Sequence, residues 1–215
     1  MFWFMGEGMQ IADVVLGFLV RVFIILAILP LHEFAHAYAS HKLGDDTAKW
    51  LGRMTLDPVK HIDPVGAIMI FFVGFGWAKP VPVNPNYYKN RKVGLAIVSA
   101  AGPLSNLAAA MLGMIIYKIL LVAGIYVPVL GSVFETFIFI NITLAVFNLI
   151  PVPPLDGFDI LALFLPNRWV AVIESYKQTL YYVLIAVMVF GSMTFVSTIS
   201  GAIFRLFDLI TRFIC

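Results

Sequence analysis

Charged residues are scarce in this sequence of 215 residues, where they make up 12% of the chain, while hydrophobic residues make up 61%. Soluble domains carry about 25% charged residues. The composition therefore excludes an ordinary soluble domain and predicts an integral membrane protein in contact with the lipid bilayer. A formal net charge of only +2 also argues against a nucleic-acid surface, which would need a concentrated basic patch.

Cysteine is almost absent, since Cys215 is the only one. An intramolecular disulfide is impossible, and no cluster of cysteines can bind a metal. Any metal ion must therefore be bound by His, Asp or Glu.

Long apolar stretches predict several membrane crossings. Arg21 is the only charge between residues 14 and 31, and residues 94–117, 136–155 and 178–204 carry none. Because a spanning helix needs about 20 mainly apolar residues, at least four crossings are expected. The fold class predicted is an all-α polytopic membrane protein with about four to six transmembrane or re-entrant segments, forming a single domain over residues 1–215.

No basic residue precedes the first apolar stretch, and Glu7 and Asp13 lie where a signal peptide has its positive charges. We therefore expect this stretch to be retained. Basic residues gather between Lys42 and Lys92, which the positive-inside rule places in the cytoplasm. The last apolar stretch either crosses once or bends near Gly191 and Gly201 into two elements.

Two shorter segments lie in the basic region. Residues 64–78 are apolar but too few to span, which predicts a re-entrant or edge element. Residues 45–57 alternate polar and apolar side chains around Gly52, which predicts a small β-hairpin.

The segment His32-Glu33-Phe34-Ala35-His36 is an HExxH motif. On a helix the two histidines stand one turn apart on one face, which suits two nitrogen ligands of one zinc ion. Glu33 then lies beside the first ligand and can take a proton from a zinc-activated water. The alternative, polar residues at a helix end, is disfavoured because ionisable groups at membrane depth are costly.

A catalytic zinc takes a third protein ligand, and Asp156 is the candidate. It follows Pro151, Pro153 and Pro154 where an apolar span breaks into irregular backbone. Taken alone, Asp156 could instead cap the next helix, and Asp159 is the fallback ligand.

These motifs resemble the site-2 protease family of intramembrane metalloproteases, in its compact prokaryotic branch without a PDZ or CBS domain. The likeness extends to residues 76–84 and to Gly102-Pro-Leu-Ser-Asn106. It implies one Zn²⁺ per chain at His32, His36 and Asp156, Glu33 as the base, and transmembrane protein segments as substrates. It also implies a prokaryotic cell membrane and an active site facing the cytosol, in agreement with the charge distribution.

Four further polar residues have weaker assignments. Asn148 and Asn106 lie in apolar helices, where polar contacts between helices are the ordinary interpretation. The family resemblance favours Asn148 as a stabiliser of the oxyanion, with Asn106 a weaker candidate for the same role. His41 and His61 fall in the charged loop and are expected to be solvated.

Two other functions remain open. A transporter or channel could use intramembrane His, Glu and Asp as an ion pathway, although the chain shows no repeated halves. A catalytically inactive membrane scaffold is the second alternative.

Overall fold

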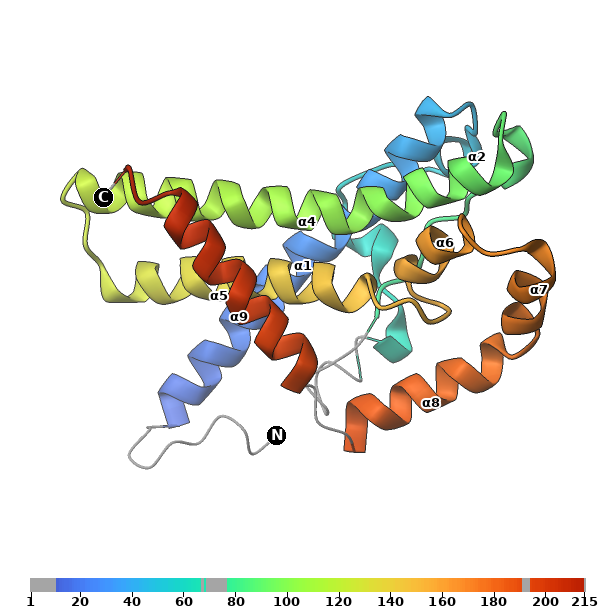
Figure 1. The fold of residues 1–215 in the computed structure, drawn as a ribbon. Helices are drawn as coiled ribbons and strands as arrows, with labels where there is room; N and C mark the ends of the chain where they lie inside the picture. Colours follow the sequence, from blue (N-terminus) through green and yellow to red (C-terminus); the bar gives the residue numbers. More distant parts are fainter. Residues whose placement is uncertain (1–10, 67, 69–76, 191–193, 215) are drawn as a thin grey trace.

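The structure is a computed structural model that describes residues 11–66, 68, 77–190 and 194–214. These residues form helices joined by turns and irregular segments (Figure 1). In chain order the elements are α1 (Ile11–Lys42), α2 (Thr47–Trp50), the 3-10 helices η2 (Pro58–His61) and η3 (Pro85–Tyr87), α4 (Arg91–Val122), α5 (Pro128–Asn148), α6 (Asp156–Ala162), α7 (Asn167–Ser175), α8 (Lys177–Phe190) and α9 (Thr194–Ile210).

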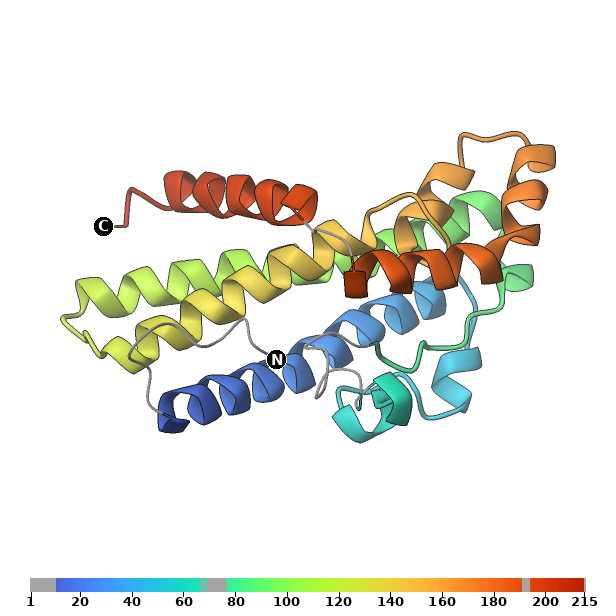
Figure 2. The same cartoon turned by 90° about the horizontal axis from the view of Figure 1, so that it is seen from below.

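Among the described residues, three helical segments are long and apolar enough to cross a membrane, namely Phe18–Lys42 in α1, Arg91–Val122 in α4 and Pro128–Asn148 in α5. Helix α4 packs against both α1 and α5, and α9 packs on α5. Figure 2 accordingly shows three layers, with α1 on one side, α4 and α5 in the middle and α9 on the other. The predicted all-α membrane fold is confirmed.

Local sequence sets the ends of α4 and α5. The Asn90 side chain accepts a hydrogen bond from the Val93 backbone N–H at 3.2 Å and caps the first turn of α4. After α4, Gly124 adopts a φ of +76°, which turns the chain. Pro128 then begins α5 at a position where its missing N–H leaves no hydrogen bond unmade. The two helices are therefore antiparallel, and the end of α5 returns to the end of the molecule where α4 begins.

The buried core lies between α4, α5 and α9. Its members are apolar side chains: Ala110, Met114, Ile138, Ile142, Val146, Phe147 and Val196. Because lipid is as apolar as these side chains, close packing and polar contacts, more than the hydrophobic effect, hold helices together inside a membrane.

The last apolar stretch forms two helices on either side of residues 191–193. Helix α8 has 14 residues and α9 has 17, so each is shorter than the length of a typical span. The Lys118 ammonium of α4 donates to the Asp208 carboxylate at 2.8 Å and fixes α9. Of the two predicted alternatives, the structure has the one with two elements. Gly201 lies inside α9 and makes no bend, while Gly191 is outside the described residues.

The predicted β-hairpin over residues 45–57 is wrong. This segment contains α2 and turns, because the Asp45 carboxylate accepts a hydrogen bond from the Thr47 backbone N–H at 2.9 Å and favours a turn over a strand. Within the described residues, β pairing is limited to one bridge between Ile62 and Ala78. The predicted re-entrant element of residues 64–78 falls mainly on residues 67 and 69–76, which lie outside the described part of the chain.

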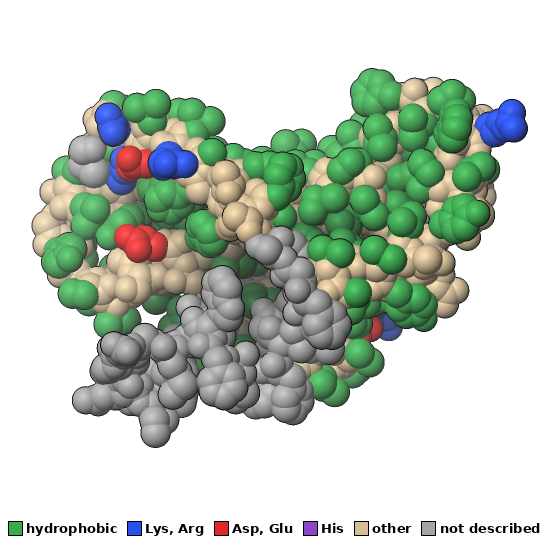
Figure 3. Space-filling view, turned by 60° about the horizontal axis from the view of Figure 1, so that its bottom comes forward, with side chains coloured by type: hydrophobic (Ala, Val, Ile, Leu, Met, Phe, Trp, Pro, Cys, Tyr) green, Lys and Arg blue, Asp and Glu red, His purple; other side chains and the backbone are tan. Residues whose placement is uncertain are grey.

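Hydrophobic side chains cover much of the surface, as Figure 3 shows for one face. Phe23, Leu104 and Phe195 are 73%, 61% and 68% exposed. Large contiguous apolar surfaces are rare on soluble monomers. Together with the three long apolar helices, this surface identifies an integral membrane protein, as the composition predicts.

Candidate metal centre and active site

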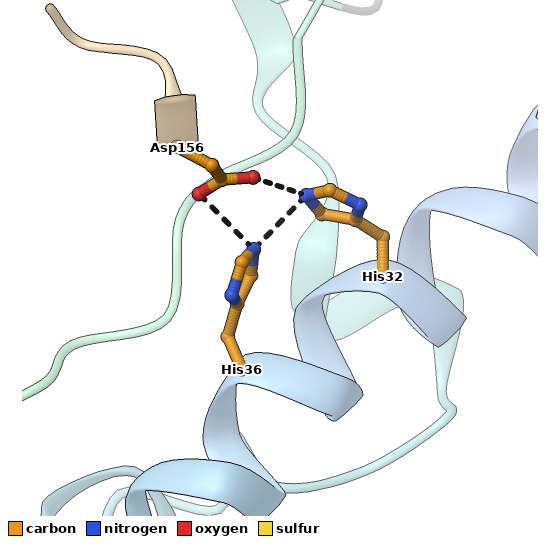
Figure 4. Close-up of side chains that lie close together, drawn as sticks. All are labelled: His32, His36 and Asp156. Carbon is orange, nitrogen blue, oxygen red and sulfur yellow. Dashed lines mark hydrogen bonds and ion pairs between the residues drawn. The ribbon is translucent and has the colours of Figure 1, made fainter. Parts of the chain in front are cut away.

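Two histidines and one aspartate from distant parts of the chain meet in one cluster (Figure 4). His32 and His36 stand one turn apart on α1, and their Nε2 atoms are 3.0 Å apart. Asp156 begins α6, and its two carboxylate oxygens lie 3.3 Å from Nε2 of His32 and 3.4 Å from Nε2 of His36. The three candidate ligand atoms all lie within 4.8 Å of one another. The fold thus brings together the three residues predicted to bind metal.

The hydrogen bonds of the two imidazoles explain why this cluster suits a cation. His36 Nδ1 lies 2.7 Å from the Val98 carbonyl oxygen, which only accepts, so this Nδ1 carries the proton. His32 Nδ1 lies 2.8 Å from Asn106 Oδ1, another acceptor. In their neutral forms the two rings direct an Nε2 lone pair into the cluster, where Asp156 Oδ2 is buried without a hydrogen-bond partner among the described residues. Three electron-pair donors of this kind fit a divalent cation, and two histidines with one carboxylate are a zinc ligand set.

One face of α4 fits closely around the two histidines. A Cβ added at Gly102 would lie 2.4 Å from His36 Nε2 and 2.6 Å from His32 Cε1, so only glycine allows this approach. Val98 lies one turn before Gly102 and Asn106 one turn after it, on the same helix face. This face therefore supplies both the space for the imidazoles and their Nδ1 partners.

Glu33 lies in the same cavity and is 8% exposed. Its Oε2 accepts a hydrogen bond from the Val81 backbone N–H at 2.8 Å. A carboxylate has about four lone-pair sites, so this bond orients the group and leaves capacity to accept a proton. The arrangement suits a general base that is not itself a metal ligand.

Val81 belongs to residues 79–84, which we call the strap and which has no regular secondary structure. Side chains from other segments hold it. The Arg53 guanidinium donates to the carbonyl oxygens of Lys79 and Pro80 at 2.7 and 3.2 Å. The Asp45 carboxylate accepts from the Asn84 backbone N–H at 2.6 Å.

Asp45 joins three segments and is 1% exposed. Besides the strap, it accepts hydrogen bonds from the Ser40 hydroxyl near the end of α1 at 2.8 Å and from the Thr47 N–H at the start of α2. Burial alone would raise the pKa of the Asp45 carboxyl, but the hydrogen bonds from Asn84, Thr47 and Ser40 hold it below its ordinary value of 3.8. The charged form of Asp45 is thus part of the folded loop.

A cavity of about 480 Å³ adjoins the cluster. Its lining includes the three candidate ligands, Glu33, residues of the strap, and side chains of α5 and α8, among them Asn148, Leu144, Tyr181, Leu184, Ile185 and Met188. Asn148 therefore lines the same cavity as the three candidate ligands, and its amide donates to the Leu144 carbonyl at 2.9 Å. Asn106 is 0% exposed and contacts His32 through Nδ1, the nitrogen turned away from Asp156.

The remaining candidates have other partners. Asp159, the fallback ligand, lines the cavity and accepts a hydrogen bond from the Ser99 hydroxyl at 2.9 Å. Burial raises the pKa of the Asp159 carboxyl, and the nearby charge of Asp156 adds to the rise. His41 is paired with Asp46 in the loop after α1.

The expectation that His61 is solvated is wrong, because its side chain is 2% exposed. Its Nε2 lies 2.8 Å from the Thr55 carbonyl oxygen, and its own carbonyl accepts from the Lys79 N–H at 2.8 Å. The segment around His61 therefore pairs with the start of the strap. Its contacts are structural.

Sequence reasoning did not assign Gly102, Ser99 or Val81 to the metal centre, and it interpreted Gly102 and Ser99 only as helix-packing positions. For Val81 the sequence does hold a signal. Pro80 and Pro82 have no backbone N–H, so the N–H of Val81 is the backbone donor between them. For Gly102 and Ser99, the contact partners lie on other helices and become visible only in the fold.

A family model described as Peptidase family M50 matches residues 127–191, which include Asp156 but not the HExxH motif. The chain is 44% identical over 141 residues to "Putative zinc metalloprotease YwhC" of Bacillus subtilis. The matched region is 63% of this chain and 64% of that protein. The chain is 30% identical over 211 residues to "Putative zinc metalloprotease Rip2" of Mycobacterium tuberculosis. The matched region is 96% of this chain and 80% of that protein. No solved structure matches the chain.

Proposed function

Because this chain belongs to peptidase family M50, we propose that it hydrolyses peptide bonds within or near the transmembrane segments of membrane proteins. Membership confirms the predicted resemblance and the assignment to the zinc metalloproteases, with Zn²⁺ as the metal. The observation that carries the proposal is that His32, His36 and Asp156 converge beside Glu33 in one cavity of a membrane-embedded fold.

Different residues of the chain have different roles in the proposed reaction. His32, His36 and Asp156 would hold the zinc ion, which supplies a Lewis acid that polarises a carbonyl and acidifies water. Glu33 takes a proton from the attacking water and delivers it to the leaving amine. Asn148, in the cavity wall, stabilises the negative charge that develops on the substrate carbonyl oxygen.

The substrate must present an extended segment, because a helix hides its carbonyl groups in its own hydrogen bonds. The strap is suited to bind such an extended segment. It lies without regular structure beside Glu33, so an unwound substrate could pair with its backbone as an added strand. The apolar side chains of α8 along the cavity, such as Leu184 and Met188, suit the apolar residues of a membrane-spanning substrate.

The test is cleavage by the purified protein in proteoliposomes that contain a model single-span substrate. The wild-type chain should cut it, and Glu33→Gln should not. Ion or solute flux without cleavage would instead indicate a transporter. Zinc binding with neither flux nor cleavage would indicate an inactive scaffold.

We place the active site towards the cytoplasm. This orientation is supported by the basic residues between Lys42 and Lys92, which in the sequence follow the end of α1 that carries the HExxH motif. In a Cys215→Ser background, a cysteine at exposed Lys49 should react with an impermeant thiol reagent only from inside. One at exposed Ile125, in the turn between α4 and α5, should react only from outside. The opposite labelling pattern would reverse the topology.

A further inference from the structure

A chain of hydrogen bonds runs from one candidate metal ligand through two asparagines on neighbouring helices. His32 Nδ1 lies 2.8 Å from Asn106 Oδ1 on α4. Asn106 Nδ2 in turn donates to Asn141 Oδ1 on α5 at 3.3 Å. Asn141 Nδ2 donates to the Phe137 carbonyl of its own helix at 2.9 Å. This series of hydrogen bonds therefore links helices α1, α4 and α5.

Both asparagines are fully buried, with 0% of each residue exposed. Neither belongs to the lining of the described cavity, which includes Asn148 instead. A substrate in that cavity would reach Asn148 but not Asn106 or Asn141. Any influence of the two buried amides on the reaction must therefore pass through His32.

The orientation of the two amide groups in this series of hydrogen bonds is fixed at the Asn141 end. The Phe137 carbonyl only accepts, so the amide nitrogen of Asn141 faces it and the amide oxygen faces Asn106. That oxygen requires a donor, which orients the Asn106 nitrogen towards Asn141 and the Asn106 oxygen towards His32. If the Asn106 amide were reversed, its nitrogen would oppose the Nδ1 proton of His32, and its oxygen would oppose the oxygen of Asn141.

The two histidines differ in this respect. His36 Nδ1 is paired with the backbone carbonyl of Val98, which cannot be reversed. His32 depends on a side-chain amide, which can rotate. Asn141 removes that freedom by fixing the orientation of Asn106.

We infer that Asn106 and Asn141 are positioning residues that hold His32 as the Nδ1-protonated tautomer, so that its Nε2 lone pair faces the metal. The inference rests on the proposed zinc site. Hydrogen-bond partners of metal-bound histidines orient the ring, and their loss typically lowers metal affinity by about 10–100-fold. Asn106 acts directly on His32, while Asn141 acts through Asn106 and has the smaller effect.

The experiment measures the zinc dissociation constant of purified variants by competition with a chelator. Asn106→Leu should weaken zinc binding by about 10–100-fold, because His32 loses its acceptor. Asn106→Asp keeps an acceptor for Nδ1 and should stay within a few-fold of the wild-type value. Asn141→Leu should give an intermediate loss. Cobalt substitution gives a second readout, since the visible spectrum of Co²⁺ should change in Asn106→Leu and be retained in Asn106→Asp.

Asn148→Leu is the matched control, because it removes the same amide from α5, and the Asn148 amide donates to the Leu144 carbonyl of its own helix. Its zinc affinity should equal that of the wild-type chain. Wild-type zinc affinity in Asn106→Leu and Asn141→Leu would overturn the inference, even if both variants melted at lower temperature, because the asparagines would then only join helices.

The two proposals fail in different ways. If zinc affinity responds as expected in a protein that cleaves no substrate, the positioning role stands and the peptidase function is refuted. If the wild-type chain binds no zinc at all, both are refuted. Should Asn106→Leu fail to fold, the comparison of Asn106→Asp and Asn141→Leu with Asn148→Leu still decides the question.

Discussion

The proposed metal ligands and the proposed general base are positioned by two different kinds of structure. His32, His36 and Asp156 lie on helices whose backbones are fixed by packing against α4, with Gly102 in direct contact with both imidazoles. Glu33 also lies on α1, but its carboxylate is oriented by the strap.

The strap is held by a few hydrogen bonds. Arg53 donates to its carbonyl oxygens, while the Asp45 and Glu33 carboxylates and the His61 carbonyl accept from its N–H groups. The long helices pack on one another, whereas the strap has these hydrogen bonds and the packing of Val81 with Ala37 and Ala48. Changes to the metal-binding region should therefore remove zinc and activity together, whereas changes to the strap should lower activity in a graded way and leave zinc bound.

The largest expected effects distinguish the metal-binding role of His36 from the general-base role of Glu33, both on α1. His36→Ala should lose both zinc and hydrolysis, because it removes a ligand. Glu33→Gln should keep zinc and the fold but reduce the rate by about 10²–10⁴-fold, the usual contribution of a general base. Zinc content by elemental analysis and the cleavage rate measure the two effects. Normal proteolysis by Glu33→Gln would contradict the assigned role.

The next comparison concerns the two aspartates of α6. Asp156→Asn should weaken zinc binding severely, because the carboxylate beside both histidines is lost. Asp159→Asn keeps an acceptor for the Ser99 hydroxyl and should retain zinc. Metal titration of the two purified variants distinguishes them. Loss of zinc in Asp159→Asn, with zinc and cleavage intact in Asp156→Asn, would exchange the two assignments.

Gly102→Ala tests how closely α4 must approach the ligands. The added methyl group would lie 2.4 Å from His36 Nε2, so the helices must separate or the ring must move. Overpacking of this kind typically destabilises by about 1–3 kcal/mol, and here we also expect weaker zinc binding.

Gly113→Ala on the same helix is the control for Gly102→Ala. Its nearest contact would be 3.1 Å from the Phe137 ring, which can shift, so its effect on zinc affinity should be small. Thermal unfolding and zinc titration measure both variants. Equal zinc affinities in the two would show that the α4 contact is not needed for metal binding.

The smallest effect is expected in the strap. Asp45→Asn should cost about 0.5–1.5 kcal/mol for each hydrogen bond weakened and lower the cleavage rate without loss of zinc. Because the pKa of Asp45 is lower in the folded protein, its charge stabilises the fold above the unfolded pKa, and this stability is lost as pH falls through the folded value.

The stability difference between the wild-type chain and Asp45→Asn should therefore shrink below about pH 4, near the ordinary pKa of an aspartate. Denaturant unfolding at several pH values measures it. Asp57→Asn, whose carboxylate is exposed and caps only a local turn, should show no comparable effect on cleavage. A constant difference across the pH range would show that the Asp45 charge does not support the loop.

Some features of this protein follow from the sequence by itself. Composition and apolar length identify three membrane helices, because a bilayer of fixed thickness requires spans of about 20 residues. The fourth apolar stretch, residues 178–204, instead falls on the two shorter helices α8 and α9. The HExxH spacing places His32 and His36 on one face of a helix whatever the rest of the chain does. The sequence also predicts Asp156 as a third ligand, from the prolines that follow α5, and the structure places it beside both histidines.

Other features depend on contacts between segments far apart in the chain, which no local pattern encodes. The β-hairpin predicted from alternation over residues 45–57 is absent because Asp45 uses its carboxylate to form a turn and hold the strap. Likewise, only the packing of α4 on α1 gives Gly102 its role and pairs His32 with Asn106. The sequence specifies which chemical groups are present and their spacing along each helix, while the tertiary structure decides which partner each group meets.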